Sequence, residues 1–160
     1  MSAFDVYLVD GQRTFMETSW LPALDSDSTD ALIGAMVAAV SPGCAIFTHE
    51  FKGAASKVTA ESTAFGLRRE HVLVEILAAF ADPAGEAAEE EQRHRQWARA
   101  TRQSFAPMAL PGGYPNFLAG DDSDRVAKSY GPNADRLIAA KRRYDRDNVF
   151  CSAIPLPVGG

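Results

Sequence analysis

A largely apolar run from His71 to about Phe80 constrains the fold more than any other feature of the sequence. Its first seven residues, His71-Val72-Leu73-Val74-Glu75-Ile76-Leu77, are typical of a half-buried strand within a sheet. Asp82-Pro83 ends the run, because proline has no backbone N–H to donate to a neighbouring strand. The run therefore predicts a sheet strand.

Other segments supply further strands and several helices. A second strand is predicted over Cys44 to Phe51, and a weaker alternation over Phe4 to Val9 suggests another. Helical patterns run from Ala31 to Val37 after a cap at Ser28-Thr29-Asp30, from Glu86–Glu91 to about Phe105, from Asp122 or Ser123 through Tyr130, and from Ala134 to Tyr144. Strands and helices do not alternate strictly, so we expect an α+β fold: an antiparallel sheet with helices packed on one face, and a helical C-terminal segment.

The length of 160 residues suits a single domain with its own core. A loop containing Pro107, Pro111, Gly112 and Gly113 interrupts regular structure and divides residues 1–110 from residues 111–160. Cys44 and Cys151 lack the CxxC spacing and are expected to be free buried thiols.

Charge and hydropathy exclude some classes of partner. Lys and Arg number 16 against 21 Asp and Glu, so the net charge is −5. This balance argues against nucleic acid and against anionic membranes, both of which attract basic surfaces. The apolar stretch from Ala31 to Val40 is too short to span a bilayer, and the first residues do not form a signal-peptide pattern. We expect a cytoplasmic protein.

Motifs for autonomous catalysis are sparse. His49, His71 and His94 are scattered, and His49-Glu50 lacks the second histidine one helical turn away, so no metal site is predicted. The chain has no Gly-x-Ser-x-Gly elbow and no GxGxxG or Walker pattern. A Ser/His/Asp or Cys/His system stays open, because its members meet in space and not in sequence.

Tyr114 and Asn116 follow the glycine-rich loop and are the best candidates for chemistry. They place a phenol and an amide close together. A tyrosine can donate a hydrogen bond or, when deprotonated, act as a base, and an asparagine can contact the edge of a heterocycle. In the alternative interpretation, Tyr114 packs on the core and Asn116 holds a turn.

The segment from Tyr114 to Phe150 also carries a family resemblance. Its blocks are Tyr114-Pro115-Asn116-Phe117, then Ser129-Tyr130-Gly131-Pro132-Asn133-Ala134-Asp135-Arg136-Leu137, then Lys141-Arg142-Arg143-Tyr144-Asp145-Arg146-Asp147-Asn148-Val149-Phe150. In this order they resemble the C-terminal signature of berberine-bridge-like, FAD-linked oxidases. A weaker likeness extends upstream to about Leu32 and includes Thr63-Ala64-Phe65 with Arg68.

The resemblance implies a division of roles along the chain. Residues 1–110 would be part of a substrate-binding domain, and residues 111–160 the berberine-bridge-like C-terminal segment. Tyr114 would be catalytic and Asn116 would face the flavin, while both, together with His49, would contact a small-molecule substrate. The Tyr-Gly-x-Asn and Lys-x-x-Tyr-Asp blocks would be structural and pack the C-terminal helix against the FAD domain.

FAD is the cofactor that the resemblance implies. No segment of the 160 residues resembles the FAD domain of that family, so this chain alone is not expected to bind FAD. Three residues depart from the family pattern: Arg146 in place of proline, Pro115 inside Tyr-x-Asn, and Lys52 in place of a small residue.

Three interpretations follow for the function. In the first, the chain is the substrate side of a flavin oxidase and needs an FAD-bearing partner. In the second, it is flavin-free: a small-molecule-binding protein or a cofactor-independent cyclase or isomerase. In the third, it is a structural remnant without a site. A surface that normally packs on an FAD domain would be apolar, and soluble proteins rarely leave such a surface exposed to water. We therefore expect a homodimer or an FAD-domain partner chain.

Overall fold

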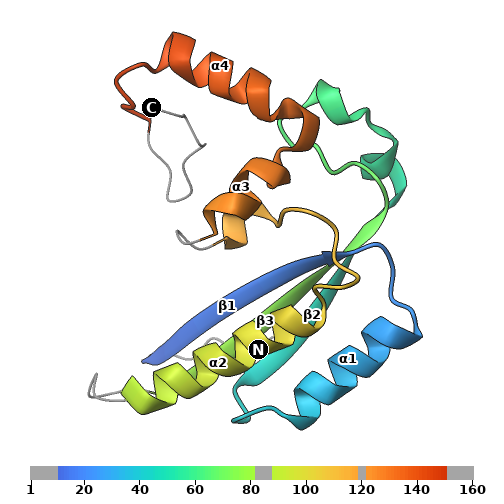
Figure 1. Cartoon of the computed structure of the whole chain (residues 1–160), viewed down its shortest axis with the longest axis vertical. Coiled ribbons are helices and arrows are strands. Elements are labelled where there is room, and N and C mark those ends of the chain that lie inside the picture. Colours follow the sequence, from blue (N-terminus) through green and yellow to red (C-terminus); the bar gives the residue numbers. More distant parts are fainter. Residues whose placement is uncertain (1–10, 82–87, 119–121, 151–160) are drawn as a thin grey trace.

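A computed structural model describes residues 11–81, 88–118 and 122–150 of the chain. Three strands, β1 (Gln12–Leu21), β2 (Cys44–Phe51) and β3 (His71–Ala81), form a sheet in the order β1-β3-β2. Both neighbours run antiparallel to the central β3 (Figure 1). The helices are α1 (Ser26–Val37), α2 (Ala88–Ser104), α3 (Ser123–Ser129) and α4 (Ala134–Tyr144).

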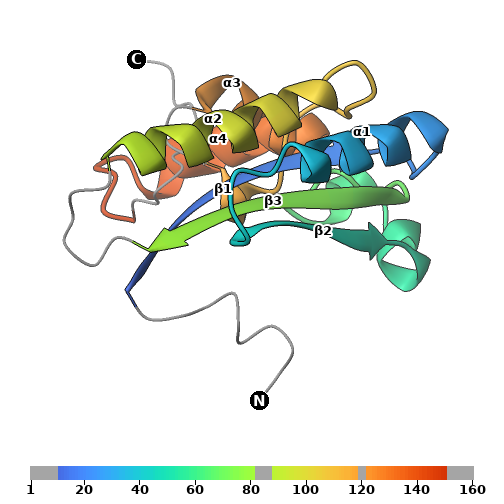
Figure 2. The ribbon, with the colours of Figure 1, turned by 90° about the horizontal axis from the view of Figure 1, so that it is seen from below.

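Helices α1 and α2 cover one face of the sheet (Figure 2). Side chains alternate along β3, so Val72, Val74 and Ile76 point into the core beneath these helices. Trp97 of α2 packs into the same core, and its Nε1 donates to the carbonyl of Ala35 in α1 at 2.9 Å. The predicted α+β fold, with an antiparallel sheet and helices on one face, is confirmed.

Strand β1 lies where no strand was predicted. The strand suggested over Phe4 to Val9 lies outside the described residues. Glu17 and Ser19 point toward the helix-covered face of β1 and are buried there, which interrupts the apolar alternation expected of a core strand. Glu17 is accommodated beside Arg102 of α2, with an ion pair of 2.8 Å between Oε2 and Nε.

The start of α1 also differs from the prediction. The helix begins after an N-cap at Asp25, three residues before the predicted cap. The Asp25 carboxylate accepts from the backbone N–H of Ser28 at 2.9 Å, and the backbone N–H of Asp25 donates to Ser28 Oγ at 2.7 Å. This reciprocal capping box fixes the first turn. The hydrogen bonds that the Asp25 carboxylate accepts from the backbone N–H and the hydroxyl of Ser28 lower the pKa of Asp25.

His94 of α2 has a structural role. Its ring is 1% exposed and stacks on Phe80 with a centroid distance of 4.7 Å. Nδ1 faces the carbonyl of Glu90 at 2.7 Å, and because a carbonyl only accepts, Nδ1 donates. Nε2 then accepts from Ser41 Oγ at 2.8 Å. The ring thereby ties α2 to the turn before β2. Cys44, in the same region, is buried and free as predicted.

The C-terminal helices are fastened to the loop between β2 and β3. Asn133 is buried, and its Nδ2 donates to the carbonyls of Ala60 and Thr63 at 2.7 and 2.9 Å. Arg136 of α4 donates to the carbonyl of Glu61 at 3.1 Å. The Tyr-Gly-x-Asn block therefore has a structural role, and it contacts a loop of this chain. Within the described residues, no helix is both long and apolar enough to cross a membrane.

Candidate functional site

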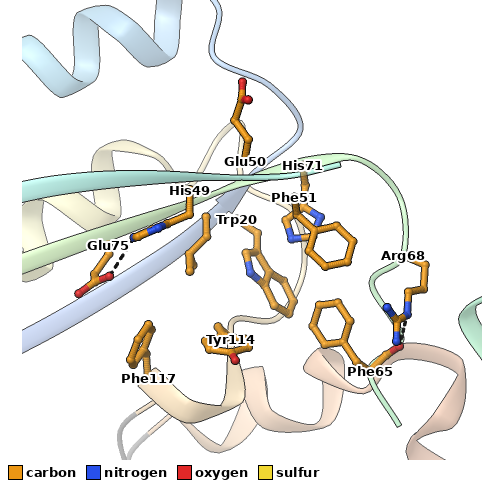
Figure 3. A pocket seen from close by; sticks show the side chains of 11 residues that line it. Trp20, His49, Glu50, Phe51, Phe65, Arg68, His71, Glu75, Tyr114 and Phe117 are labelled. Atoms are coloured by element: carbon orange, nitrogen blue, oxygen red, sulfur yellow. Dashed lines mark hydrogen bonds and ion pairs between the residues drawn. The ribbon is translucent and has the colours of Figure 1, made fainter. Parts of the chain in front are cut away.

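A cavity of about 600 Å³ opens on the face of the sheet opposite α1 and α2. The strands contribute one group of lining residues: Trp20, His49, Glu50, Phe51, His71, Leu73 and Glu75. The loops contribute a second group: Phe65, Arg68, Tyr114 and Phe117. Figure 3 shows side chains from the strands pointing toward Tyr114 and Phe117. We call this cavity the aromatic pocket.

The register of the sheet brings the strand residues together. Leu73 of β3 lies between Trp20 of β1 and His49 of β2, and His71 pairs with Phe51. Residues directly opposite each other in an antiparallel sheet point to the same face. Positions distant in sequence thus form one wall. Glu75 lies two residues along from Leu73 and therefore on the same face.

Aromatic rings line most of this wall. Trp20 and Phe65 meet edge to face with ring centroids 6.0 Å apart. The ring centroids of Phe51 and Phe65 are 5.5 Å apart. Tyr114 and Phe117 make a second edge-to-face pair at 5.3 Å. Such a surface favours flat, apolar ligand groups, since offset and edge-to-face contacts between rings are favourable.

An acid–imidazole pair lies within the pocket. His49 Nε2 and Glu75 Oε2 are 3.2 Å apart, within hydrogen-bond distance (Figure 3). The Glu75 side chain is 16% exposed and that of His49 is 57% exposed, so Glu75 is the more enclosed partner. A carboxylate positioned by an imidazole beside a cavity can accept a proton from a bound ligand.

His71 is a second histidine in the pocket wall. Its Nδ1 lies 2.8 Å from the carbonyl oxygen of Arg69 and its ring stacks on Phe51 with a centroid distance of 4.7 Å. Burial lowers the pKa of His71 below its usual value of 6.5. The imidazole is therefore neutral near pH 7.

Arg68 is the cation that lines the pocket, and its guanidinium is engaged by its own loop. Nε donates to the carbonyl of Phe65 at 3.2 Å, Nη1 to that of Ala55 at 3.4 Å, and Nη2 to Thr63 Oγ1. These hydrogen bonds shape the loop that carries Phe65. The guanidinium is thus mainly structural.

Of the three site residues proposed from sequence, two lie in the aromatic pocket and one lies outside it. Tyr114 and His49 both line the aromatic pocket. Asn116 is exposed and does not line it, but its Nδ2 donates to Tyr114 Oη at 3.2 Å. Pro115 opens the short 3₁₀ turn Pro115–Phe117, which holds the two side chains on one loop. The predicted roles of Tyr114, Asn116 and His49 stay predictions.

Several pocket residues were missed by sequence reasoning. Glu75 was interpreted only as a member of a strand, and His71 was considered only as a strand residue and a metal ligand. Trp20 lies on the strand that was not predicted. The charged Glu75 inside an apolar run was the available signal, because a buried carboxylate needs a partner. In the described ranges, no three His, Cys, Asp or Glu side chains gather in a way that could hold a metal ion.

Comparison with known proteins shows a family likeness in the C-terminal part of the chain. Residues 113–157 match the model of the family described as berberine and berberine like. The match begins two residues after the predicted boundary at residue 111. No curated protein sequence matches the chain significantly. Together with the shared fold below, the family match confirms the predicted likeness to part of the berberine-bridge-like, FAD-linked oxidases.

Solved structures of that class share the fold. Berberine bridge enzyme from Eschscholzia californica matches with a TM-score of 0.75 and 19% identity over 92% of this chain. A BBE-like protein from Arabidopsis thaliana gives 0.79 and 15% over 94%, and a glycopeptide hexose oxidase complexed with teicoplanin gives 0.74 and 20% over 91%. The chain spans 33%, 34% and 32% of these structures, about a third of their length.

Proposed function

We propose that this chain forms the substrate-binding side of an FAD-dependent oxidoreductase and that the FAD is held outside these 160 residues. The single observation that carries the proposal is the aromatic pocket with Glu75 and His49 paired inside it. Its ring-lined wall would bind an organic substrate. The pair would accept a proton during oxidation. The shared fold and the family match of residues 113–157 support this assignment.

The described residues fit the substrate side of a flavin site but not the whole cofactor. The ring-lined wall suits one side of a flat ligand. A diphosphate, in contrast, needs several free donors or cations, and each nitrogen of the Arg68 guanidinium already donates one hydrogen bond, to Phe65, Ala55 or Thr63. FAD, when bound by the complete enzyme, would accept the hydride. No step of that transfer is assigned to residues of this chain.

The residues of this chain would bind the substrate and move its proton. Trp20, Phe51 and Phe65 would hold a flat group and exclude water from it. Glu75 Oε2 would take the proton of a substrate hydroxyl or C–H group, with His49 Nε2 positioning the carboxylate at 3.2 Å. Tyr114, oriented by the amide of Asn116, would hydrogen-bond the substrate from the opposite wall.

To test the proposal, the tagged chain is purified from its native cells together with any proteins bound to it. Bound flavin is then measured, and oxygen consumption is followed with small organic substrates. We expect Glu75→Gln to reduce turnover by about a hundredfold, the usual contribution of a general acid or base. Tyr114→Phe should reduce it about fivefold, the contribution of one neutral hydrogen bond. Flavin content should not change. Glu89→Gln is the matched control, because Glu89 is exposed on α2 outside the pocket.

Two results would contradict the proposal. One is an active flavin assembly whose turnover is the same for wild type, Glu75→Gln and Tyr114→Phe. The other is an assembly without flavin that converts a substrate, which would favour a cofactor-independent cyclase or isomerase.

A further inference from the structure

Arg125 of α3 bridges two segments that carry opposite sides of the aromatic pocket. Its Nη2 donates to the carbonyl of Thr18 at 2.6 Å, and Thr18 lies two residues before Trp20 on β1. Its Nε donates to the carbonyl of Gly112 at 3.2 Å, and Gly112 lies two residues before Tyr114. One guanidinium therefore holds both the strand that carries Trp20 and the loop that carries Tyr114.

Further contacts tie this loop at the same junction. The backbone N–H of Leu110 donates to the carbonyl of Trp20 at 2.7 Å. Ser129, one helical turn after Arg125, is buried, and its Oγ accepts from the backbone N–H of Gly113 at 3.0 Å. The same hydroxyl donates to the backbone carbonyl of Arg125 at 2.7 Å. The loop is thus bound to both β1 and α3.

The distances around Arg125 favour a bridging role over simple charge neutralisation. Glu17 is a buried carboxylate nearby, but its close partner is Arg102, at 2.8 Å between Oε2 and Nε. Arg125 Nη1 lies 4.0 Å from Glu17 Oε2 and 3.4 Å from Asp122 Oδ1. The hydrogen bond from Arg125 to the Thr18 carbonyl is shorter than either of these contacts. Hydrogen bonds from a charged donor are among the strongest in proteins.

Gly113 shows how closely the guanidinium and the loop approach each other. A Cβ at Gly113 would lie 2.6 Å from Arg125 Nη2. A side chain at this position would therefore push the guanidinium away from the Thr18 carbonyl. The bridge also requires arginine, because its planar fork donates to separate acceptors at once, whereas a lysine presents a single ammonium group.

We propose that Arg125 is a positioning residue that sets the spacing between the strand wall of the pocket, which contains Trp20, and the loop wall, which contains Tyr114. It acts through the carbonyls of Thr18 and Gly112. The inference rests on the proposed function and deepens it, because it concerns how the same pocket is held ready for a ligand. Without the bridge, binding must also draw the two walls together.

The test follows amide hydrogen exchange by NMR and the binding of indole, a flat aromatic probe, in the full 160-residue chain. Wild type is compared with Arg125→Lys, which keeps the charge and loses the fork. The N–H of Leu110, whose partner lies across the junction, should exchange more than about tenfold faster in the variant, the effect of losing one hydrogen bond from a charged group. The N–H of Ala79, which donates to Gly43, should keep its wild-type rate. Indole should bind about fivefold more weakly.

Two more variants separate the bridge from other effects. Gly113→Ala keeps the arginine but displaces its guanidinium, so it should reproduce the faster exchange of Leu110 and decides the matter if Arg125→Lys fails to fold. Lys128→Met removes an exposed cation from the same helix and should change neither exchange nor indole binding. Circular dichroism checks that each variant is folded.

The outcomes distinguish this inference from the proposed function. Exchange of Leu110 at the wild-type rate in Arg125→Lys and Gly113→Ala would overturn the inference. Equal acceleration of Leu110 and Ala79 would also overturn it, because it would show a loss of global stability alone, and so would an unchanged affinity for indole. Failure of wild type to bind indole would count against the proposed function, while the exchange of Leu110 would still decide the role of Arg125.

Discussion

At the scale of single residues, polar side chains among apolar neighbours form the candidate site, and one of them, Glu17, makes stability depend on pH. Glu75 and His71 lie in an apolar strand and became candidates only when the sheet register placed them in one cavity. Tyr114 and His49 could be proposed from sequence, the first because a glycine-rich loop precedes it. Their neighbours in the pocket could not, since pocket membership depends on which strands pair and in what register.

Glu17 provides a pH-dependent test at this scale. Burial raises the pKa of its carboxyl above the usual 4.5, and the nearby Arg102 only partly offsets this effect. The folded state therefore keeps the Glu17 proton to a higher pH than the unfolded state does. As pH rises from 4.5 through the folded pKa, the unfolded state ionises first and the free energy of unfolding falls.

We expect Glu17→Gln to lack this part of the pH dependence. Thermal unfolding of wild type and Glu17→Gln between pH 4 and pH 7 should show the variant gaining stability relative to wild type as pH rises. Glu89→Gln, at an exposed site, should follow wild type throughout. A variant that loses stability relative to wild type as pH rises would show that the ion pairs of Glu17 outweigh its burial.

At the scale of elements, local sequence patterns predict the strands and helices whose buried face is apolar throughout. The strand over Cys44–Phe51 and the helix over Ala134–Tyr144 have the predicted bounds. Strand β1 was missed because its covered face includes Glu17 and Ser19, which are accommodated by tertiary contacts that no local pattern reveals. The start of α1 was misplaced because several residues before it can cap a helix.

Two glycines test how tightly these elements are packed. A Cβ at Gly43 would lie 2.1 Å from the carbonyl oxygen of Ala79 in β3, so Gly43→Ala must displace backbone and should cost more than about 2 kcal/mol. Gly34 lies within α1, where an added Cβ would meet open space, so Gly34→Ala should stabilise by about 0.5–1 kcal/mol. Urea unfolding of both variants measures the difference. Equal stability of the two would contradict the close approach of Gly43 to β3.

At the scale of the whole molecule, the fold leaves apolar side chains uncovered. Ile33 and Val37 of α1 are 58% and 83% exposed, and Phe150 is 80% exposed. Ile33 and Val37 lie one helical turn apart on α1, and an exposed apolar helix face is a candidate for packing against a partner. The predicted homodimer or FAD-domain partner chain stays a prediction, which the mass of the purified chain in light scattering addresses. The cytoplasmic location likewise stays a prediction.

The likeness to a longer class of enzyme was accessible from sequence because its motifs lie close together between Tyr114 and Phe150. The cavity was not, since it is built by three strands and two loops that meet only in the fold. The proposed function accordingly concerns how this chain would divide the work with a part that holds FAD.

The visible absorption spectrum of the purified chain, before and after mixing with FAD and desalting, tests this division most directly. If the chain supplies the substrate side and FAD is held elsewhere, both samples should be free of flavin bands. Flavin retained in equimolar amount by the chain alone would contradict this account, because the cofactor would then be held within these 160 residues.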